Sequence, residues 1–102
     1  MLIDSGIYLK LEVTVFEYVQ ALLSLKFKKS EKENDRFVFY KHPKSNSFLR
    51  IPKWVSESDL VPKSTMLIEA NIMFAMGIIS DADDLAKIIQ QQRLARAVQA
   101  QG

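Results

Sequence analysis

Cationic and aromatic residues are concentrated in one stretch of the chain, a combination that suits contact with a phosphate-bearing polymer. Residues 26–53 contain nine lysine or arginine residues and three acidic ones, a local excess of +6, although the whole chain carries a net charge of +2. Such a cluster attracts anions, and its phosphate contacts depend on salt but not on base sequence. The candidate phosphate contacts are Lys28, Lys29, Lys41, Lys44, Arg50 and Lys53.

The aromatic residues of this stretch follow a strand pattern. Side chains of a strand alternate between its two faces, so one row must contribute to the core while the other can meet solvent. The two rows are Phe37, Phe39 and Lys41, and Val38, Tyr40 and His42. Exposed aromatic rings, for which Tyr40 and Phe48 are the candidates, could stack with unpaired bases.

A second interpretation needs no nucleic acid. Lysines beside a hydrophobic strand discourage its pairing with other chains, and the second aromatic row could be covered by an N-terminal strand or by a partner protein. The sequence leaves both interpretations open.

The only histidine, His42, could act as a general base or bind a metal. It has no second histidine and no carboxylate at metal-binding spacing, which favours an ordinary surface residue that joins the candidate RNA-binding set. The chain has no cysteine and three glycines, which excludes thiolate sites and a glycine-rich phosphate loop. We therefore predict no catalytic residue, no metal site and no cofactor.

Length and composition predict one soluble domain over residues 1–102, and the order of the elements described below makes it α+β. The chain is 48% hydrophobic and 25% charged, and no apolar run approaches the ~18–20 residues that span a bilayer. The N-terminus lacks the basic flank and apolar block of a secretory signal, so a cytoplasmic location is expected, without membrane contact.

The first half of the chain predicts a strand, a helix and three further strands. Alternation over residues 7–13 indicates a strand, and the capping box of Thr14 and Glu17 opens a helix over residues 15–26. A basic edge strand over 27–33 and strands over 36–41 and 48–51 follow. Turns are expected at 34–35 and 43–47, and Pro52 should end the last strand.

The second half predicts two helices. Ser64 or Thr65 can cap a helix that runs to Met76 and ends at Gly77; because it is apolar almost all round, it should be covered on more than one side. A C-terminal helix over 81–98 opens with a box-like cap and an acidic first turn. Its apolar stripe stops near residue 92, so the last ten residues should be either frayed or held by a partner.

The predicted fold is a three-stranded antiparallel sheet covered on one face by two helices. The strand over 7–13 would either extend this sheet or pair with a second copy of the protein.

The element order and several short motifs over residues 14–79 resemble the HicA/YcfA-like toxin family. The matching motifs are Phe39-Tyr40-Lys41-His42-Pro43, Arg50-Ile51-Pro52 and Met76-Gly77-Ile78. The resemblance implies a double-stranded-RNA-binding-like α-β-β-β-α core, an mRNA ribonuclease activity and an antitoxin partner.

One departure from the family bears on catalysis. The family's glycine-serine-histidine motif falls on Asp35, Arg36 and Phe37, and a phenyl ring cannot transfer protons. The resemblance therefore implies a non-catalytic, RNA-binding member. The alternatives are a homodimeric protein-interaction module without a nucleic-acid role, and a ribonuclease with an altered site that uses His42 and Lys41.

Overall fold

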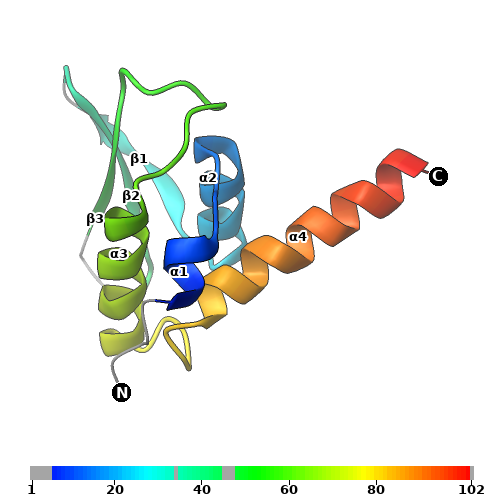
Figure 1. Cartoon of the computed structure of the whole chain (residues 1–102). Coiled ribbons are helices and arrows are strands. Elements are labelled where there is room, and N and C mark those ends of the chain that lie inside the picture. The colour runs from blue at the N-terminus through cyan, green and yellow to red at the C-terminus, as the bar shows by residue number, and fades with distance from the viewer. Residues whose placement is uncertain (1–5, 34, 45–47, 102) are drawn as a thin grey trace.

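The computed structural model describes residues 6–33, 35–44 and 48–101, which form an α+β fold (Figure 1). A three-stranded antiparallel sheet in the order β1-β2-β3 is combined with helices, as predicted. The predicted turn residues Asn34 and Ser45–Ser47 lie outside the described residues. The elements are α1 (Gly6–Lys10), α2 (Val15–Ser24), β1 (Lys28–Glu33), β2 (Phe37–Lys41), β3 (Phe48–Pro52), α3 (Lys63–Ala75) and α4 (Asp84–Gln101).

The central strand β2 fixes which side chains share a face of the sheet. Phe39 lies opposite Arg50 of β3, Tyr40 opposite Leu49, and Lys41 opposite Lys28 of β1. Because directly opposed residues point to the same side, Tyr40 and Leu49 belong to the face that packs on the core. Pro52 is the last paired residue of β3, opposite Phe37, as expected of a residue without an N–H group.

Helix α2 begins with the predicted capping box. The Thr14 hydroxyl accepts a hydrogen bond from the Glu17 backbone N–H (3.2 Å), and the Glu17 carboxylate accepts one from the Thr14 N–H (3.0 Å). The helix ends at Ser24, two residues before the predicted boundary, because Lys26 adopts a left-handed φ of 73°.

The predicted strand over residues 7–13 is wrong, because residues 6–10 form helix α1. Tyr8 and Leu11, three residues apart, are both buried, and the Tyr8 hydroxyl donates to the carbonyl oxygen of Ala82 (2.6 Å). Only Thr14 of the following segment pairs with a distant strand-like residue, Leu60. Within the described residues, no N-terminal strand extends the sheet.

Helix α3 begins at Lys63, earlier than the predicted cap, and no side chain caps it. It ends as predicted, with Gly77 at φ +73°. Met66, Ala70 and Met73 form its buried face, whereas Ile68 is 59% exposed. One apolar flank of this helix therefore meets solvent.

Helix α4 begins at Asp84, whose carboxylate accepts from the backbone N–H groups of Ser80 and Asp81 (3.1 Å each). Asp81 and Asp83 thus precede the helix instead of forming its first turn. The helix continues to Gln101, and its outer half extends away from the body of the molecule (Figure 1). Leu94 and Val98 on this half are each 69% exposed.

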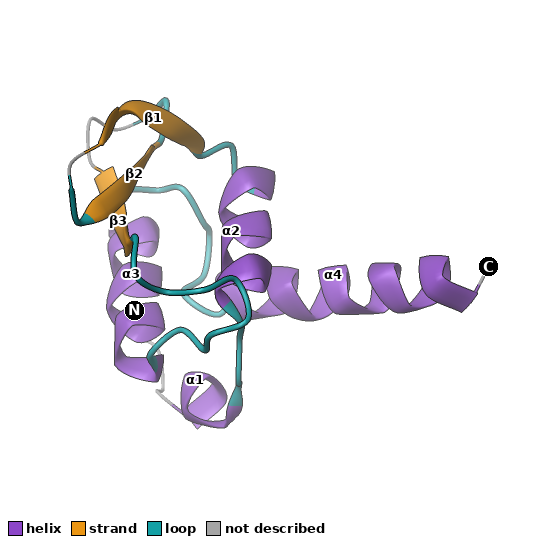
Figure 2. Cartoon of the chain, turned by 90° about the horizontal axis from the view of Figure 1, so that it is seen from above, coloured by secondary structure: helices purple, strands orange, loops and turns teal. Residues whose placement is uncertain are grey.

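An ion pair fastens α4 to α2. The Arg93 guanidinium donates to both carboxylate oxygens of Glu17 and to the carbonyl oxygen of Glu12. Arg96 lies 3.6 Å from the same carboxylate. Helices α2 and α3 lie on the same side of the sheet, and α4 extends outward from beside α2 (Figure 2). Among the described helices, none combines the length and apolar character that crossing a bilayer requires.

Candidate nucleic-acid interface

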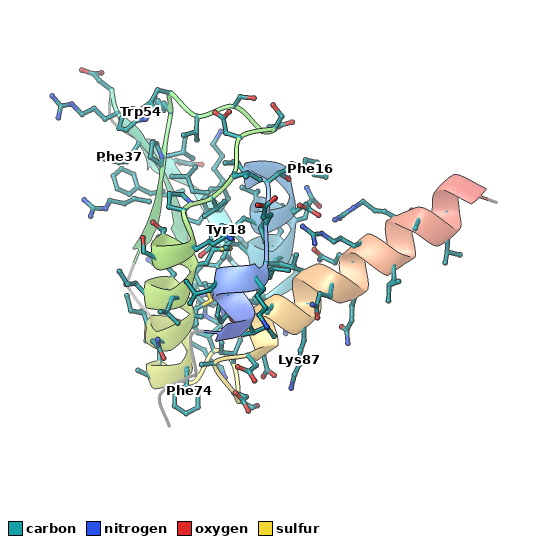
Figure 3. The ribbon with its side chains drawn as sticks, in the orientation of Figure 1. Phe16, Tyr18, Phe37, Trp54, Phe74 and Lys87 are labelled. Atoms are coloured by element: carbon teal, nitrogen blue, oxygen red, sulfur yellow. The ribbon has the colours of Figure 1, made fainter. Side chains whose placement is uncertain are left out.

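The face of the sheet that points away from the core carries a cluster of aromatic rings. Phe37 lies between Phe39, with ring centroids 6.5 Å apart, and Trp54, 5.7 Å away. Phe37 and Trp54 lie on the side of the sheet away from α2 (Figure 3), and Trp54 is 69% exposed. Trp54 comes two residues after the end of β3, and its ring lies beside Phe37 of β2.

A guanidinium group lies against this cluster. The Arg50 side chain, exposed on the same face because Arg50 pairs with Phe39, places its guanidinium carbon 5.3 Å from the centroid of the Phe37 ring. A cation over an aromatic face is attracted by the ring quadrupole. The result is a surface that offers both stacking area and positive charge.

Two lysines extend this surface along the strands. Lys41 follows Phe37 and Phe39 in the alternation of β2, and Lys28 lies directly opposite it on β1. Both side chains are exposed. Like charges placed directly opposite each other destabilise a strand pair, so an anion between them would be favourable. We define the outer sheet face as Lys28, Phe37, Phe39, Lys41, Arg50 and Trp54.

The remaining predicted phosphate contacts lie elsewhere. Lys29 opposes Tyr40 and lines, together with Lys53, a hollow of about 280 Å³ between the sheet and α2. Lys44 is exposed in the turn after β2. The structure therefore separates the predicted cationic set into two sides of the sheet and a turn.

His42 is a buried structural residue, so its interpretation as a surface, RNA-contacting side chain is wrong. It is 4% exposed, and its ring meets that of Phe27 edge-on at 5.0 Å. Its Nε2 lies 2.9 Å from the carbonyl oxygen of Leu25, and its Nδ1 accepts from the Lys44 N–H (3.0 Å). This network assigns the neutral tautomer with its proton on Nε2. With both nitrogens engaged by backbone, neither is available to a substrate or a metal.

Tyr40 is also buried, at 8% exposed, so it cannot serve as an exposed stacking surface. Burial raises the pKa of its hydroxyl. Phe48, the other predicted stacking residue, belongs to β3, but its side chain lies outside the described residues. Trp54, which is not among the candidates from the sequence, is the exposed ring beside Phe37. The strand alternation that groups Phe37 with Phe39 and Lys41 was the signal in the sequence for the face that points away from the core.

A cavity of about 310 Å³ opens beside the outer sheet face. Arg50 and Trp54 belong to both. The other lining residues come from α2, the end of β3, the following loop and the first turns of α3, and most are apolar: Val15, Tyr18, Ile51, Pro52, Val55, Leu60, Val61, Pro62, Thr65 and Glu69.

Two of the polar side chains that line this cavity, Tyr18 and Glu69, are hydrogen-bonded to each other. The Tyr18 hydroxyl donates to Oε1 of Glu69. Burial raises the pKa of Tyr18 well above its ordinary value, and the neighbouring Glu69 charge adds to the effect. Burial likewise raises the pKa of Glu69, against the weaker opposing effects of the Tyr18 hydrogen bond and the Arg50 charge. A carboxyl group that is costly to ionise thus lies among apolar side chains.

Among the residues that the structure describes, no group of three or more histidine, aspartate or glutamate side chains could hold a metal ion. Comparison with family models, with curated proteins and with solved structures gives no match to this chain.

Proposed function

We propose that this protein binds single-stranded RNA on its outer sheet face and does not cleave it. The observation that carries the proposal is the juxtaposition of Lys28 with Lys41, two exposed cations directly opposite each other beside the half-buried rings of Phe37 and Phe39 and the exposed ring of Trp54. A phosphate between the two ammonium groups would turn a repulsive pair into a binding site.

The aromatic rings supply the second half of the proposal. Bases of an unpaired strand can stack on Trp54 and Phe37, because every base offers a π-face whatever its identity. Arg50, already placed over Phe37, adds a donor for phosphate or base oxygens. Double-stranded RNA offers no free base faces, so this arrangement favours a single strand.

The family assignment belongs to the same proposal. The order α2-β1-β2-β3-α3 agrees with a double-stranded-RNA-binding-like core, and we propose a divergent HicA/YcfA-like protein of the cytoplasm with an antitoxin-like partner. The absence of catalysis is supported by Phe37, which occupies the family's catalytic position and lies in the aromatic cluster. It is supported also by His42, whose two nitrogens are engaged by backbone.

RNA affinity of a charge-reversed variant tests the proposal. We expect Lys28→Glu/Lys41→Glu to weaken binding of a fluorescent, unstructured RNA oligomer, measured by anisotropy over a series of salt concentrations. Loss of two phosphate contacts should reduce the slope of log affinity against log salt by about 1.4. Trp54→Ala should cost about 1–3 kcal/mol of binding free energy by loss of one stacking surface.

The matched control is Lys10→Glu/Lys87→Glu, which changes the net charge equally. Both lysines are exposed, and Lys87 lies at the other end of the molecule from Trp54 (Figure 3). Equal loss of affinity in the control would show that only net charge matters, and unchanged binding in the first variant would refute the proposed interface.

A second candidate function is homodimerisation through α4. Leu94 and Val98 lie four residues apart on one helix face and are each 69% exposed. Closed two-fold assemblies commonly bury such a stripe against its own copy. This assembly would leave the outer sheet face accessible, so it is compatible with RNA binding.

A further inference from the structure

We propose that the cavity beside the outer sheet face receives a guanine base of the bound strand, held by Glu69 at its polar end and by Trp54 and Arg50 at its entrance. This inference rests on the proposed RNA binding and names the base that the same site selects.

The size and lining of the cavity suit one flat ring system. Its volume of about 310 Å³ lies at the lower end of the ~300–1,000 Å³ range of small-ligand pockets. Val15, Ile51 and Val61 are among its apolar walls, which would remove the faces of a base from water. A few polar groups among such walls are the usual arrangement for orienting a ligand.

The entrance connects the cavity with the outer sheet face. Trp54 touches the aromatic cluster through Phe37, and Arg50 lies over the same ring, yet both residues also line the cavity. A strand lying along the outer sheet face could therefore turn one base into the cavity while its neighbours stay stacked outside. Extrusion is cheapest for an unpaired base, since no base pair must be broken.

The polar groups select the base. In its ionised form the Glu69 carboxyl group has about four acceptor sites, of which the Tyr18 hydroxyl uses one on Oε1. The remaining acceptor sites of Glu69 need hydrogen-bond donors. Guanine alone among the four RNA bases presents two adjacent donors, N1–H and N2–H, on its Watson–Crick edge, followed by the acceptor O6. Arg50, which donates only, can serve O6 in the same row.

The other bases fit this order less well. Uracil presents a single N–H between two carbonyl oxygens, which a carboxylate repels. Adenine and cytosine each present one amino group beside a ring nitrogen that accepts. Each would leave acceptors of Glu69 unmatched in an apolar cavity, and an unmatched buried polar group is costly.

Base preference of the intact protein is the primary test, and it requires no variant. The chain has one tryptophan, so quenching of Trp54 fluorescence reports binding of each octamer and gives its affinity. The probes are an octameric oligouridylate and the same octamer with one central guanosine, adenosine or cytidine. We expect the guanosine octamer to bind at least about tenfold more tightly, the lower range for one well-matched bidentate contact.

Two variants locate the preference. Glu69→Gln keeps the side-chain shape but replaces one acceptor oxygen by a donor, so the guanosine octamer should bind no better than oligouridylate while oligouridylate affinity stays unchanged. Val55→Phe narrows the cavity from the loop side and should have the same effect without touching the carboxyl group. Thermal unfolding of both variants shows whether they fold.

The outcomes separate this inference from the proposed function. Equal affinity for all four octamers, or a preference for adenosine or cytidine, overturns the guanine pocket and leaves RNA binding intact. Binding of none of the octamers overturns the proposed function. If in that case guanosine monophosphate still quenches Trp54 fluorescence, while the other three nucleoside monophosphates do not, the guanine pocket exists although the protein does not bind RNA.

Discussion

The imidazole of His42 joins two backbone segments, one just after α2 and one in the turn after β2. Its nitrogens engage the carbonyl oxygen of Leu25, just after α2, and the N–H of Lys44, in the turn after β2. Leu25 precedes β1 in the chain and Lys44 follows β2, so the ring holds the end of the helix against the sheet.

We expect His42→Ala to destabilise the fold by about 1–3 kcal/mol, because each abandoned polar group loses its partner in a buried place. Urea denaturation monitored by circular dichroism measures the change. Lys44→Ala, which removes only an exposed side chain, is the control and should be nearly neutral. RNA affinity of the folded fraction should be unchanged in both variants; a selective loss in His42→Ala would reinstate the histidine as a contact.

Protonation of Glu17 makes the stability of the folded state depend on pH. Its hydrogen bond from Arg93 lowers its pKa from 4.5 to about 2, with the Thr14 backbone adding to the effect. The folded state therefore holds this proton less readily than the unfolded state. The stabilisation is fully present above pH 4.5 and is lost as the pH falls toward about 2.

Chemical denaturation between pH 2 and pH 6 is the check on Glu17, with wild type compared with Glu17→Gln. We expect the variant to be less stable at pH 6 and to show a smaller loss of stability on acidification. Parallel curves for the two proteins would mean that other carboxyl groups carry the acid sensitivity.

At the scale of elements, α3 ends where its backbone turns left-handed. Gly77 has a φ of +73°, and a Cβ built there would meet no heavy atom within 4 Å, so any cost of substitution is conformational. We expect Gly77→Ala to lower the free energy of unfolding by about 1–2 kcal/mol, the strain of that region for an L-residue. Asn tolerates the conformation better, so Gly77→Asn should lose less. Thermal and urea unfolding would rank the three proteins, and equal losses for alanine and asparagine would contradict this cause.

Local patterns predicted the elements whose determinants are local. The capping box of Thr14 and Glu17 gave the start of α2, and alternation gave β2 and the division of its side chains into two faces. The failures have distant causes. The alternation around Tyr8 predicted a strand. In the structure Tyr8 lies in helix α1, where its hydroxyl donates to the carbonyl oxygen of Ala82, 74 residues later.

The same distinction explains the candidate site. Lys28, Lys41 and Arg50 could be proposed from residue type alone, and the structure places them on one face. The burial of His42 and Tyr40 could not be foreseen, because it depends on Leu25 and on how the sheet lies over the core. The cavity could not be foreseen either, since Tyr18 and Glu69 are 51 residues apart.

At the scale of the whole molecule, the charged face and the apolar end of α4 are separate surfaces. If α4 mediates a homodimer, light scattering after size exclusion should give twice the 11.7 kDa chain mass at micromolar concentration. Leu94→Lys/Val98→Lys should return the mass to that of one chain and leave RNA affinity unchanged. A single-chain mass for the unaltered protein at every concentration would remove the homodimer as a candidate.

The outer half of α4 also makes the molecule easy to instrument. Because its last turns run clear of the body and lie away from Trp54 (Figure 3), a dye attached through Gln99→Cys would disturb neither the sheet nor the cavity. The chain contains no competing thiol, so coupling would be confined to that one position. The protein can thus be tethered to a surface through this helix with its outer sheet face turned toward the solution.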